Sequence, residues 1–561
     1  MSKIKRTRAQ ESRAAIEKLY VIMRHLFIRG GYKPLGVSGS SLFQSLLILS
    51  PEIYGSINDD ERVEMDGLMY VLDRLPKGIE ECRYIRFISK EGLDKSGFKV
   101  LVPSKRRRNC YRIDKDQMYI ELTRGRSDIY DILTHLTFLY VESEKIKNHS
   151  LDTKGIQNMA WEKLEEIVKL EEQGKKFNKE IAYTYLSTVL GRTFEETVNA
   201  CEKFAEDPSR NSLFRVAYWL GKVAIDEEKE NKDREITFSA TLRERIGHHV
   251  YGEQWAQNIK AFISDHGFLS RPIHIISANL HSTMNSLYAY QVLRKQLKEE
   301  NLTSIALELN KTKNEKLRSK VESFALKHGL YEIPDNSGTN LTVQIIDTAQ
   351  LNLDELPEEI KVDKQRIEAK KPILLIMDYA FGEQAFETMD ELLRPYENNG
   401  KEHPLKVDSI SIMGKAGILQ GEKGDIMVPT AHIFEGTADN YPIQNEFSQT
   451  DFEGQKLEIF EGPMVTVLGT SLQNKDVLEY FARSSWGAIG LEMEGAHYQK
   501  AIQSASKIRK SVKGSVTVRY AYYASDNPLV TGKTLASGSL GEEGVKPTYL
   551  ITTKILSKIL G

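Results

Sequence analysis

Acidic residues near the carboxyl terminus have types and spacing that suit acid–base chemistry. Glu492 and Glu494 follow a short apolar run, and Asp526 follows a second apolar run further along the chain. Carboxylates at the carboxyl ends of strands in an open α/β sheet point into the ligand crevice. There a carboxyl group can transfer a proton or accept hydrogen bonds from a ligand. The alternative is structural, because acidic side chains also stabilise the first turn of a following helix.

The elements that must position these carboxylates are short strands alternating with helices. From Arg271 onward, apolar runs of strand length alternate with stretches of helical periodicity. This alternation predicts an α/β fold with a mostly parallel central sheet flanked by helices. The expected strands before the carboxylates are residues 273–276, 305–309, 341–346, 373–377, 409–413, 425–428 and 464–468. The expected helices include residues 311–328, 383–393 and 547–560, and the charged stretch 354–371 is expected to be a loop.

The amino-terminal part has a different pattern. Its apolar residues recur at three- and four-residue steps through residues 129–147, 156–173, 179–190 and 194–205. We therefore expect two domains, a mostly α-helical one over residues 1–265 and an α/β one over residues 266–561. The first thirty residues predict an amphipathic helix with a basic, solvated face. Residues 36–41 lack the lysine of a phosphate loop and predict a turn that caps the next helix.

Two arginine-rich stretches flank an expected strand at residues 118–122. They are Lys105 to Arg108 and Arg124 to Arg126. Clustered guanidinium groups can clamp a phosphate through forked hydrogen bonds, or the stretches can be solvated charge runs. Together with the basic first helix they also define a weak nucleic-acid hypothesis, for which salt-dependent retention would be the signature.

The composition excludes several classes of protein. The chain has 561 residues, 40% of them hydrophobic and 28% charged, with a net charge of −2, which is typical of a globular protein and does not favour nucleic-acid binding. The apolar run at residues 19–28 contains Arg24 and His25, so no signal peptide is expected, and no run reaches the ~18 apolar residues of a membrane span. Three distant cysteines argue against a disulfide framework and favour the cytoplasm. His135, His248 and His249 have no ligand partners at helical spacing, so no metal or other cofactor is expected.

Several motifs, in order, resemble those of the nucleoside phosphorylase and nucleosidase superfamily, which includes purine nucleoside phosphorylases, methylthioadenosine/S-adenosylhomocysteine nucleosidases and AMP nucleosidases. The motifs that carry the resemblance are residues 373–385, the glycine-rich residues 407–419 with 424–429, Glu492-Met493-Glu494, and Val518-Arg519 with Ser525-Asp526. The resemblance covers the carboxyl-terminal half only. It implies a nucleoside phosphorylase-like fold, a ribose-binding Glu-Met-Glu and a purine-contacting aspartate.

These motifs assign roles to the acidic residues. Cleavage of a purine N-glycosidic bond places negative charge on the departing base, so a carboxylic acid near N7 can act as general acid, and Asp526 is the candidate. Glu494 is the candidate to accept hydrogen bonds from the ribose hydroxyls, which strengthen as the sugar becomes oxocarbenium-like, with Met493 against the sugar. Two adjacent carboxylates raise each other's pKa, so Glu492 is given a lesser, partly structural role.

The opposite side of the substrate is expected to meet two further groups. Asn279, His281 and Ser282 follow the strand 273–276 at a helix amino terminus and suit a phosphate or a positioned water, with His281 either a base or a helix cap. Lys415 suits a phosphate, or pairs with Asp425 or Asp378. The complete set of candidates is catalytic Asp526 and Glu494, and substrate-binding Glu492, Met493, Ser525, Gly414, Lys415, Gly417, Leu472, Asn279, His281 and Ser282.

The function expected from the resemblance is hydrolysis of the N-glycosidic bond of a purine nucleotide or nucleoside, in the manner of an AMP nucleosidase. Lys415 and the additional amino-terminal domain favour a nucleotide. Two alternatives remain, a phosphate-dependent purine nucleoside phosphorylase and a non-catalytic sensor of purine nucleotides. The resemblance also implies a homo-oligomer.

Overall fold

The computed structural model describes residues 6–299, 301–437, 439–454, 456–531 and 540–561. The chain forms two compact units. The first contains the residues up to His248 together with Ser471–Val477, and the second contains His249–Thr470 and Leu478–Gly561. The helix at Val250–Asp265 therefore belongs to the second unit.

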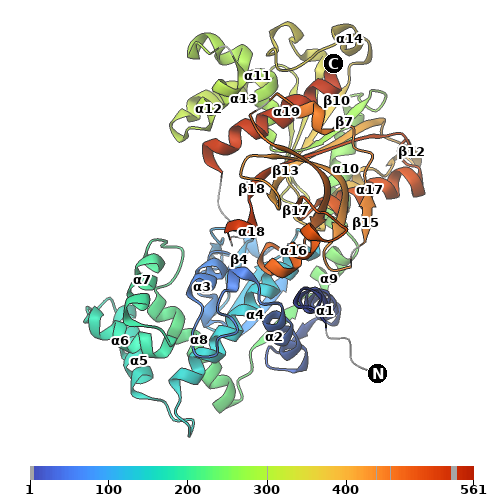
Figure 1. The fold of residues 1–561 in the computed structure, drawn as a ribbon. Coiled ribbons are helices and arrows are strands. Elements are labelled where there is room, and N and C mark those ends of the chain that lie inside the picture. Colours follow the sequence, from blue (N-terminus) through green and yellow to red (C-terminus); the bar gives the residue numbers. More distant parts are fainter. Residues whose placement is uncertain (1–5, 300, 438, 455, 532–539) are drawn as a thin grey trace. The chain divides into compact units, whose positions relative to one another are not determined.

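The first unit combines helices with a sheet (Figure 1). Its helices are α1 (Arg8–Arg29), α2 (Val37–Leu49), α3 (Met65–Leu72), α4 (Gly125–Ser150), α5 (Met159–Glu172), α6 (Lys179–Leu190), α7 (Phe194–Ala205), α8 (Leu213–Glu230) and α9 (Ala240–Gly247). Its six-stranded sheet has the order β1 (Gly31–Tyr32), β6 (Glu235–Phe238), β2 (Tyr84–Ile88), β5 (Gln117–Glu121), β4 (Cys110–Arg112) and β3 (Val100–Leu101). The sequence anticipated α1, the helices α4 to α7 and β5, but not α3 or the sheet as a whole.

The arginine-rich stretches of the first unit form a buried ion network. Arg108 is only 2% exposed and contacts Asp128 at 2.8 Å and Asp131, both on α4. Arg106 pairs with Asp131 at 2.8 Å, and Arg124 pairs with Asp128 at 3.1 Å. The interpretations of Arg106 and Arg108 as a solvated charge run, a phosphate clamp or a nucleic-acid surface are therefore wrong, because α4 supplies their carboxylate partners.

The second unit is built on a ten-stranded mixed sheet. Its strands are β7 (Ile273–Ser277), β8 (Leu330–Ile333), β9 (Val343–Asp347), β10 (Ile373–Met377), β13 (Val407–Ile418), β14 (Ile426–Phe434), β15 (Asn440–Pro442), β16 (Ile459–Thr466), β17 (Gly490–Glu492) and β18 (Thr517–Asp526). The strands β13, β18, β14, β16 and β17 pair in a closed ring, and β7, β10, β9 and β8 extend the sheet from β13. A separate hairpin joins β11 (Tyr396–Asn398) to β12 (Lys401–His403).

The direction of the strands corrects one prediction. The α/β class is confirmed, but the sheet is mixed rather than mostly parallel. Strands β7, β10, β13 and β18 pair in parallel with their neighbours in this row, as expected for crossover connections. Strand β9 is antiparallel to both β8 and β10, and β17 is antiparallel to β13. The antiparallel β17 leads the chain from the sheet to Glu494, which stands just before the next helix.

Helices cover both sides of this sheet. They include α10 (Val250–Asp265), α11 (Leu280–Leu297), α12 (Leu302–Asn310), α13 (Glu315–Ala325), α14 (Lys364–Lys370), α15 (Gln384–Leu392), α17 (Gly495–Gln503) and α19 (Val545–Leu560). The chain also forms α16 (Lys475–Arg483), which begins within the segment Ser471–Val477 of the first unit, and the short α18 (Pro528–Thr531). One large apolar core contains α10, α15 and α17, and another contains α11, α13 and α19. A smaller apolar cluster joins α12 to α19. In Figure 1, α11, α12, α13 and α19 lie together beside β7 and β10.

The helix α12 replaces a predicted strand at residues 305–309. Leu302, Ile305, Ala306 and Leu309 are buried at helical spacing, and the Asn301 side chain caps the helix by accepting from the Ser304 amide at 2.8 Å. A short apolar run fits either a strand or a buried helix, and the cap decides it. The expected loop at residues 354–371 likewise contains α14.

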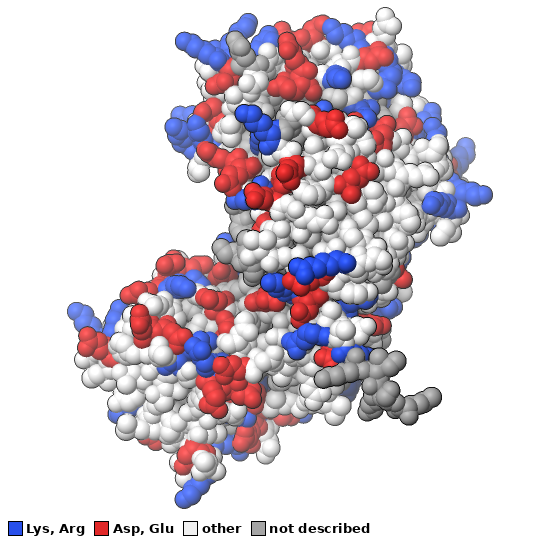
Figure 2. Space-filling view, viewed as in Figure 1, with Lys and Arg blue, Asp and Glu red and all other residues white. Residues whose placement is uncertain are grey.

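The face of the molecule drawn in Figure 2 shows no dominant charge. On the face drawn in Figure 2, basic and acidic side chains are interspersed over both units. This agrees with the net charge of −2. Among the described residues, no helix is long and apolar enough to cross a membrane.

Candidate active site

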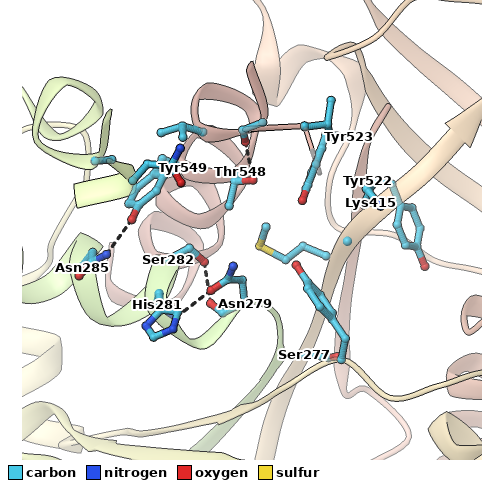
Figure 3. Close-up of a pocket in the computed structure, with 18 of the residues that line it drawn as sticks. Ser277, Asn279, His281, Ser282, Asn285, Lys415, Tyr522, Tyr523, Thr548 and Tyr549 are labelled. Carbon is cyan, nitrogen blue, oxygen red and sulfur yellow. Dashed lines mark hydrogen bonds between the residues drawn. The ribbon is translucent and has the colours of Figure 1, made fainter. Parts of the chain in front are cut away.

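A cavity of about 740 Å³ lies in the second unit, where β7 and β10 end and where the later parts of β13 and β18 pass. It contains Glu494 and residues from α11, α12 and α13, and it is bounded on another side by α19. The described lining includes the predicted residues Asn279, His281, Ser282, Gly414, Lys415 and Glu494. Figure 3 shows Asn279, His281 and Ser282 on one side, across from Lys415 and Tyr522. The fold therefore brings together segments that are far apart in the sequence.

Glu494 is the one acidic side chain in the described lining of the cavity. It follows β17 and stands at the amino end of α17. The Gly382 amide donates to its Oε1 at 2.8 Å. Burial, together with the nearby charge of Glu492, raises the pKa of Glu494 to about 8. This shift favours the protonated form of Glu494 near neutral pH.

Glu492 has a helix-capping role instead. It is 2% exposed, and its carboxylate accepts hydrogen bonds from the Thr466 hydroxyl and from the amides of Glu494 and Gly495. Burial raises the pKa of Glu492 to about 7 against the effect of these donors. Neither Glu492 nor Met493, which is 8% exposed, is in the described lining. Because the Glu492 carboxylate binds the amides at the start of the helix, it faces away from the cavity. Of the three residues Glu492-Met493-Glu494, only Glu494 is in the described lining.

Asp526 lies at the end of β18, beside the cavity wall. It pairs in register with Gly417 of β13 after an irregularity between Ala416 and Gly417. The Ser525 hydroxyl lies 2.6 Å from its Oδ1. Burial lowers the pKa of Lys415 and the Asp526 carboxylate opposes this effect, so the two side chains are electrostatic neighbours. Asp526, Ser525 and Gly417 support the wall at Lys415 and are not themselves in its described lining.

Lys415 projects from β13 into the lining of the cavity. Among the described residues it forms no ion pair with Asp425 or Asp378. Asp425 instead accepts from the amides of Glu422 at 2.8 Å and Glu458 at 3.0 Å, which close the turn before β14. The ion-pair alternative for Lys415 is therefore not realised, and its ammonium group is available to a ligand.

The loop between β7 and α11 presents polar groups to the cavity. Asn279 caps α11, because its Oδ1 accepts from the His281 amide at 2.9 Å. The capping function thus belongs to Asn279, and the His281 imidazole lies in the lining. The Ser282 hydroxyl donates to the Asn279 carbonyl at 2.8 Å and lies 3.1 Å from the Thr552 hydroxyl. Ser282 is therefore held firmly in place.

Leu472 is not part of this site. It lies in Ser471–Val477, which belongs to the first unit, and it is 2% exposed. It is absent from the described lining of the cavity. Leu472 was predicted only from its position in the order of the motifs. At this point, however, the chain packs into the core of the first unit.

Aromatic residues that the sequence did not identify form much of the cavity wall. The tyrosines in the described lining are Tyr379, Tyr498, Tyr522, Tyr523 and Tyr549. The Tyr498 hydroxyl lies 3.0 Å from Ser277 Oγ, and the Tyr522 hydroxyl lies 3.3 Å from His432 Nε2, so these rings are fixed. The available signal was the run Tyr520, Tyr522 and Tyr523 before Asp526. Such a wall suits a planar aromatic ligand.

One further cation in the lining also escaped sequence reasoning. Arg318 comes from α13, in the stretch 311–328 that the sequence predicted only as a helix. Among the described residues, no cluster of three or more His, Cys, Asp and Glu could hold a metal ion. The described lining therefore offers one carboxyl group, the basic side chains of Lys415 and Arg318, an imidazole, hydroxyl groups and aromatic rings.

Comparison with known proteins assigns the chain to a family. A family model described as "Family of unknown function (DUF6909)" matches residues 41–311 and 298–561, so the chain belongs to this family. A search of curated proteins found no match.

Solved structures similar to part of the chain include three hydrolases. The 5′-methylthioadenosine/S-adenosyl homocysteine nucleosidase of Campylobacter jejuni is 12% identical over 52% of this chain and 98% of its own, with a TM-score of 0.31. A futalosine hydrolase mutant of Helicobacter pylori is 13% identical over 52% of this chain and 100% of its own, with a TM-score of 0.29. The MTA/SAH nucleosidase of Streptococcus pneumoniae, in complex with 8-aminoadenine, is 11% identical over 51% of this chain and 99% of its own, with a TM-score of 0.30.

Proposed function

We propose that the protein hydrolyses the N-glycosidic bond of a purine nucleotide or nucleoside, with AMP as the leading candidate substrate. The observation that carries the proposal is Glu494, a single desolvated carboxyl group in a tyrosine-walled cavity, with Asp526 beside the same wall. The order of the sequence motifs around these two residues supports it further.

The proposed reaction divides the chemistry between two carboxyl groups. The bond between ribose C1′ and the purine nitrogen breaks, and the Asp526 carboxyl gives its proton to the base as the electron pair leaves with it. Glu494, once ionised, accepts hydrogen bonds from the ribose hydroxyls and stabilises the positive charge that develops on the sugar.

The nucleophile in this proposal is a water molecule on the α11 side of the cavity. His281 and the Asn279 side chain are placed there by the cap of α11. As water oxygen bonds to C1′, the imidazole of His281 takes the proton that the water loses. The tyrosines pack on the purine ring and exclude bulk water from it. Exclusion of water lowers the local dielectric and so strengthens the electrostatic contacts.

The test is release of free base. The protein is incubated with AMP, adenosine, inosine and methylthioadenosine, each with and without inorganic phosphate. Release without phosphate is expected. Strict phosphate dependence would instead identify a phosphorylase, for which Lys415 provides a suitable cation. Tight binding of AMP without any release would identify a non-catalytic sensor.

A further inference from the structure

The second cation of the cavity, Arg318, lies on the part of the lining formed by α12 and α13. Its neighbours there in the described lining include Asn310 and Thr312. Arg318 is half-buried, whereas Asn310 and Thr312 are exposed. Arg318 is thus positioned where an arriving ligand would meet it.

The guanidinium group of Arg318 is partly used to hold the turn after α12. Its Nη1 donates to the carbonyls of Leu309 and Lys311, each at 2.8 Å, and its Nη2 donates to the Thr312 carbonyl at 3.3 Å. A guanidinium group has five N–H donors. The Nε–H and one Nη2–H have no further partner among the described residues.

The charge of Arg318 is not balanced by an acid in this part of the protein. No carboxylate pairs with it among the described residues, and its contacts are neutral carbonyls. The carboxyl group in the described lining is Glu494, whose raised pKa of about 8 leaves it mostly uncharged at neutral pH. The other cation, Lys415, is partly offset by Asp526. Within the described lining, Arg318 is therefore the cation that no described carboxylate offsets.

We propose that Arg318, with Asn310 and Thr312, forms a subsite for a phosphate group. Arginine binds phosphate through paired N–H donors, and the amide of Asn310 and the hydroxyl of Thr312 add neutral donors. Since the turn carbonyls fix the guanidinium in advance, little side-chain entropy is lost when the phosphate binds. This inference rests on the proposed function and makes the 5′-phosphate of a nucleotide the group recognised.

The decisive measurement is the ratio of kcat/KM for AMP to that for adenosine. In Arg318→Met, kcat/KM for AMP is expected to fall about 10- to 100-fold, as for loss of a charge-assisted hydrogen bond, while that for adenosine changes less than about threefold. Arg318→Lys keeps the charge without the fork and is expected to give an intermediate ratio. A matched control is Arg294→Met, which removes another half-buried arginine that pairs with Glu355 outside the described lining.

A purely structural role of Arg318 gives a different pattern. If the arginine only holds the turn, both Arg318→Met and Arg318→Lys would lower AMP and adenosine cleavage by the same factor, and the proposal would be overturned. Adenosine cleavage with and without inorganic phosphate separates the two sources of phosphate. Loss of phosphate dependence in Arg318→Met, with AMP unaffected, would assign the subsite to the free ion.

Failure of the proposed function is recognised separately. If the wild-type protein releases no base from any substrate, equilibrium binding of AMP and adenosine to the wild type and to Arg318→Met replaces the kinetic ratio. A selective loss of AMP affinity would keep the phosphate subsite in a binding protein. Equal affinities of the wild type for AMP and adenosine would overturn it.

Discussion

Asp526 is the residue whose replacement tests the chemistry most directly. Asp526→Asn keeps the size of the side chain and a hydrogen-bonding group but removes the transferable proton. If Asp526 is the general acid, base release should fall by about 10²- to 10⁴-fold. The measurement is the rate of base release at saturating substrate, with circular dichroism to verify the fold. A variant that retains wild-type turnover would remove Asp526 from the mechanism.

Glu494 predicts a pH dependence of activity. Its role requires the ionised form, while burial raises its pKa to about 8. We therefore expect kcat/KM to rise with pH through this range in the free enzyme, where the profile reports groups of the unliganded protein. In Glu494→Gln this rising limb should be lost together with most of the activity. A flat wild-type profile up to pH 8 would contradict the assignment.

The same carboxyl group also links stability to pH. Its folded pKa of about 8 lies above the ordinary value of 4.5, so the folded state holds the proton more tightly than the unfolded chain. The protonated Glu494 therefore contributes its full stabilisation of the folded state at a pH below 4.5. This contribution is lost as the pH rises through about 8, the pKa in the folded state. Glu494→Gln imitates the protonated form. Urea unfolding at a series of pH values should therefore show a smaller loss of stability for the variant than for the wild type between these limits.

At the level of elements, the close packing of Gly495, the first residue of α17, against His432 and Glu492 positions Glu494. A Cβ atom on Gly495 would lie 2.3 Å from the His432 ring and 2.8 Å from Glu492 Oε1. Gly495→Ala should therefore destabilise the protein by about 1–3 kcal/mol through overpacking, and it should weaken activity by moving Glu494. Gly514→Ala, where no atom lies within 4 Å of the new Cβ, is the control. Chemical denaturation of both variants measures the difference, and equal stability would contradict the packing argument.

The sequence predicted those elements whose pattern is local. The periodicity of β10 and α19 is set by neighbouring residues, and the structure has these elements close to the expected places. The capping turn expected at residues 36–41 is wrong in its extent, because Val37 to Ser41 already belong to α2 and the N-cap Gly36 makes no side-chain hydrogen bond. The strand expected at 305–309 is a helix, and the antiparallel β9 and β17 were not anticipated. Strand direction depends on which distant strand is the partner, and that information is not contained in an apolar run.

The candidate site was predictable to a similar extent. Glu494, Lys415 and His281 sit next to glycines or helix starts, which leave a recognisable pattern, and all three reach the cavity. Arg318 and Tyr549 come from helices that look like ordinary surface or core elements in the sequence. Only tertiary packing brings them to the same cavity, so no local signal could have selected them.

For the molecule as a whole, the buried ion network predicts where stability can be lost. Arg108→Met would leave Asp128 and Asp131 with one fewer cation in the interior, at a cost of about 3–5 kcal/mol. Hydrogen exchange followed by mass spectrometry should show the loss of protection in the first unit, including residues 471–477. The exposed neighbour Arg107, changed to Met, should have an effect within about 0.5 kcal/mol. Loss of protection spread evenly over both units would contradict the division of the chain.

Because of the segment Ser471–Val477, the first unit is built from two separate stretches of the chain, with most of the second unit between them. The segment leaves the second unit, supplies Asn474, whose amide donates to the Leu49 carbonyl at 2.9 Å, and returns after Val477. Gln473 accepts from the Glu52 amide at 3.0 Å in the same segment. A recombination event at a single point would therefore separate these residues from their partners. Unlike domains joined by one linker, these halves cannot be exchanged between genes as independent modules, and we expect them to be inherited together.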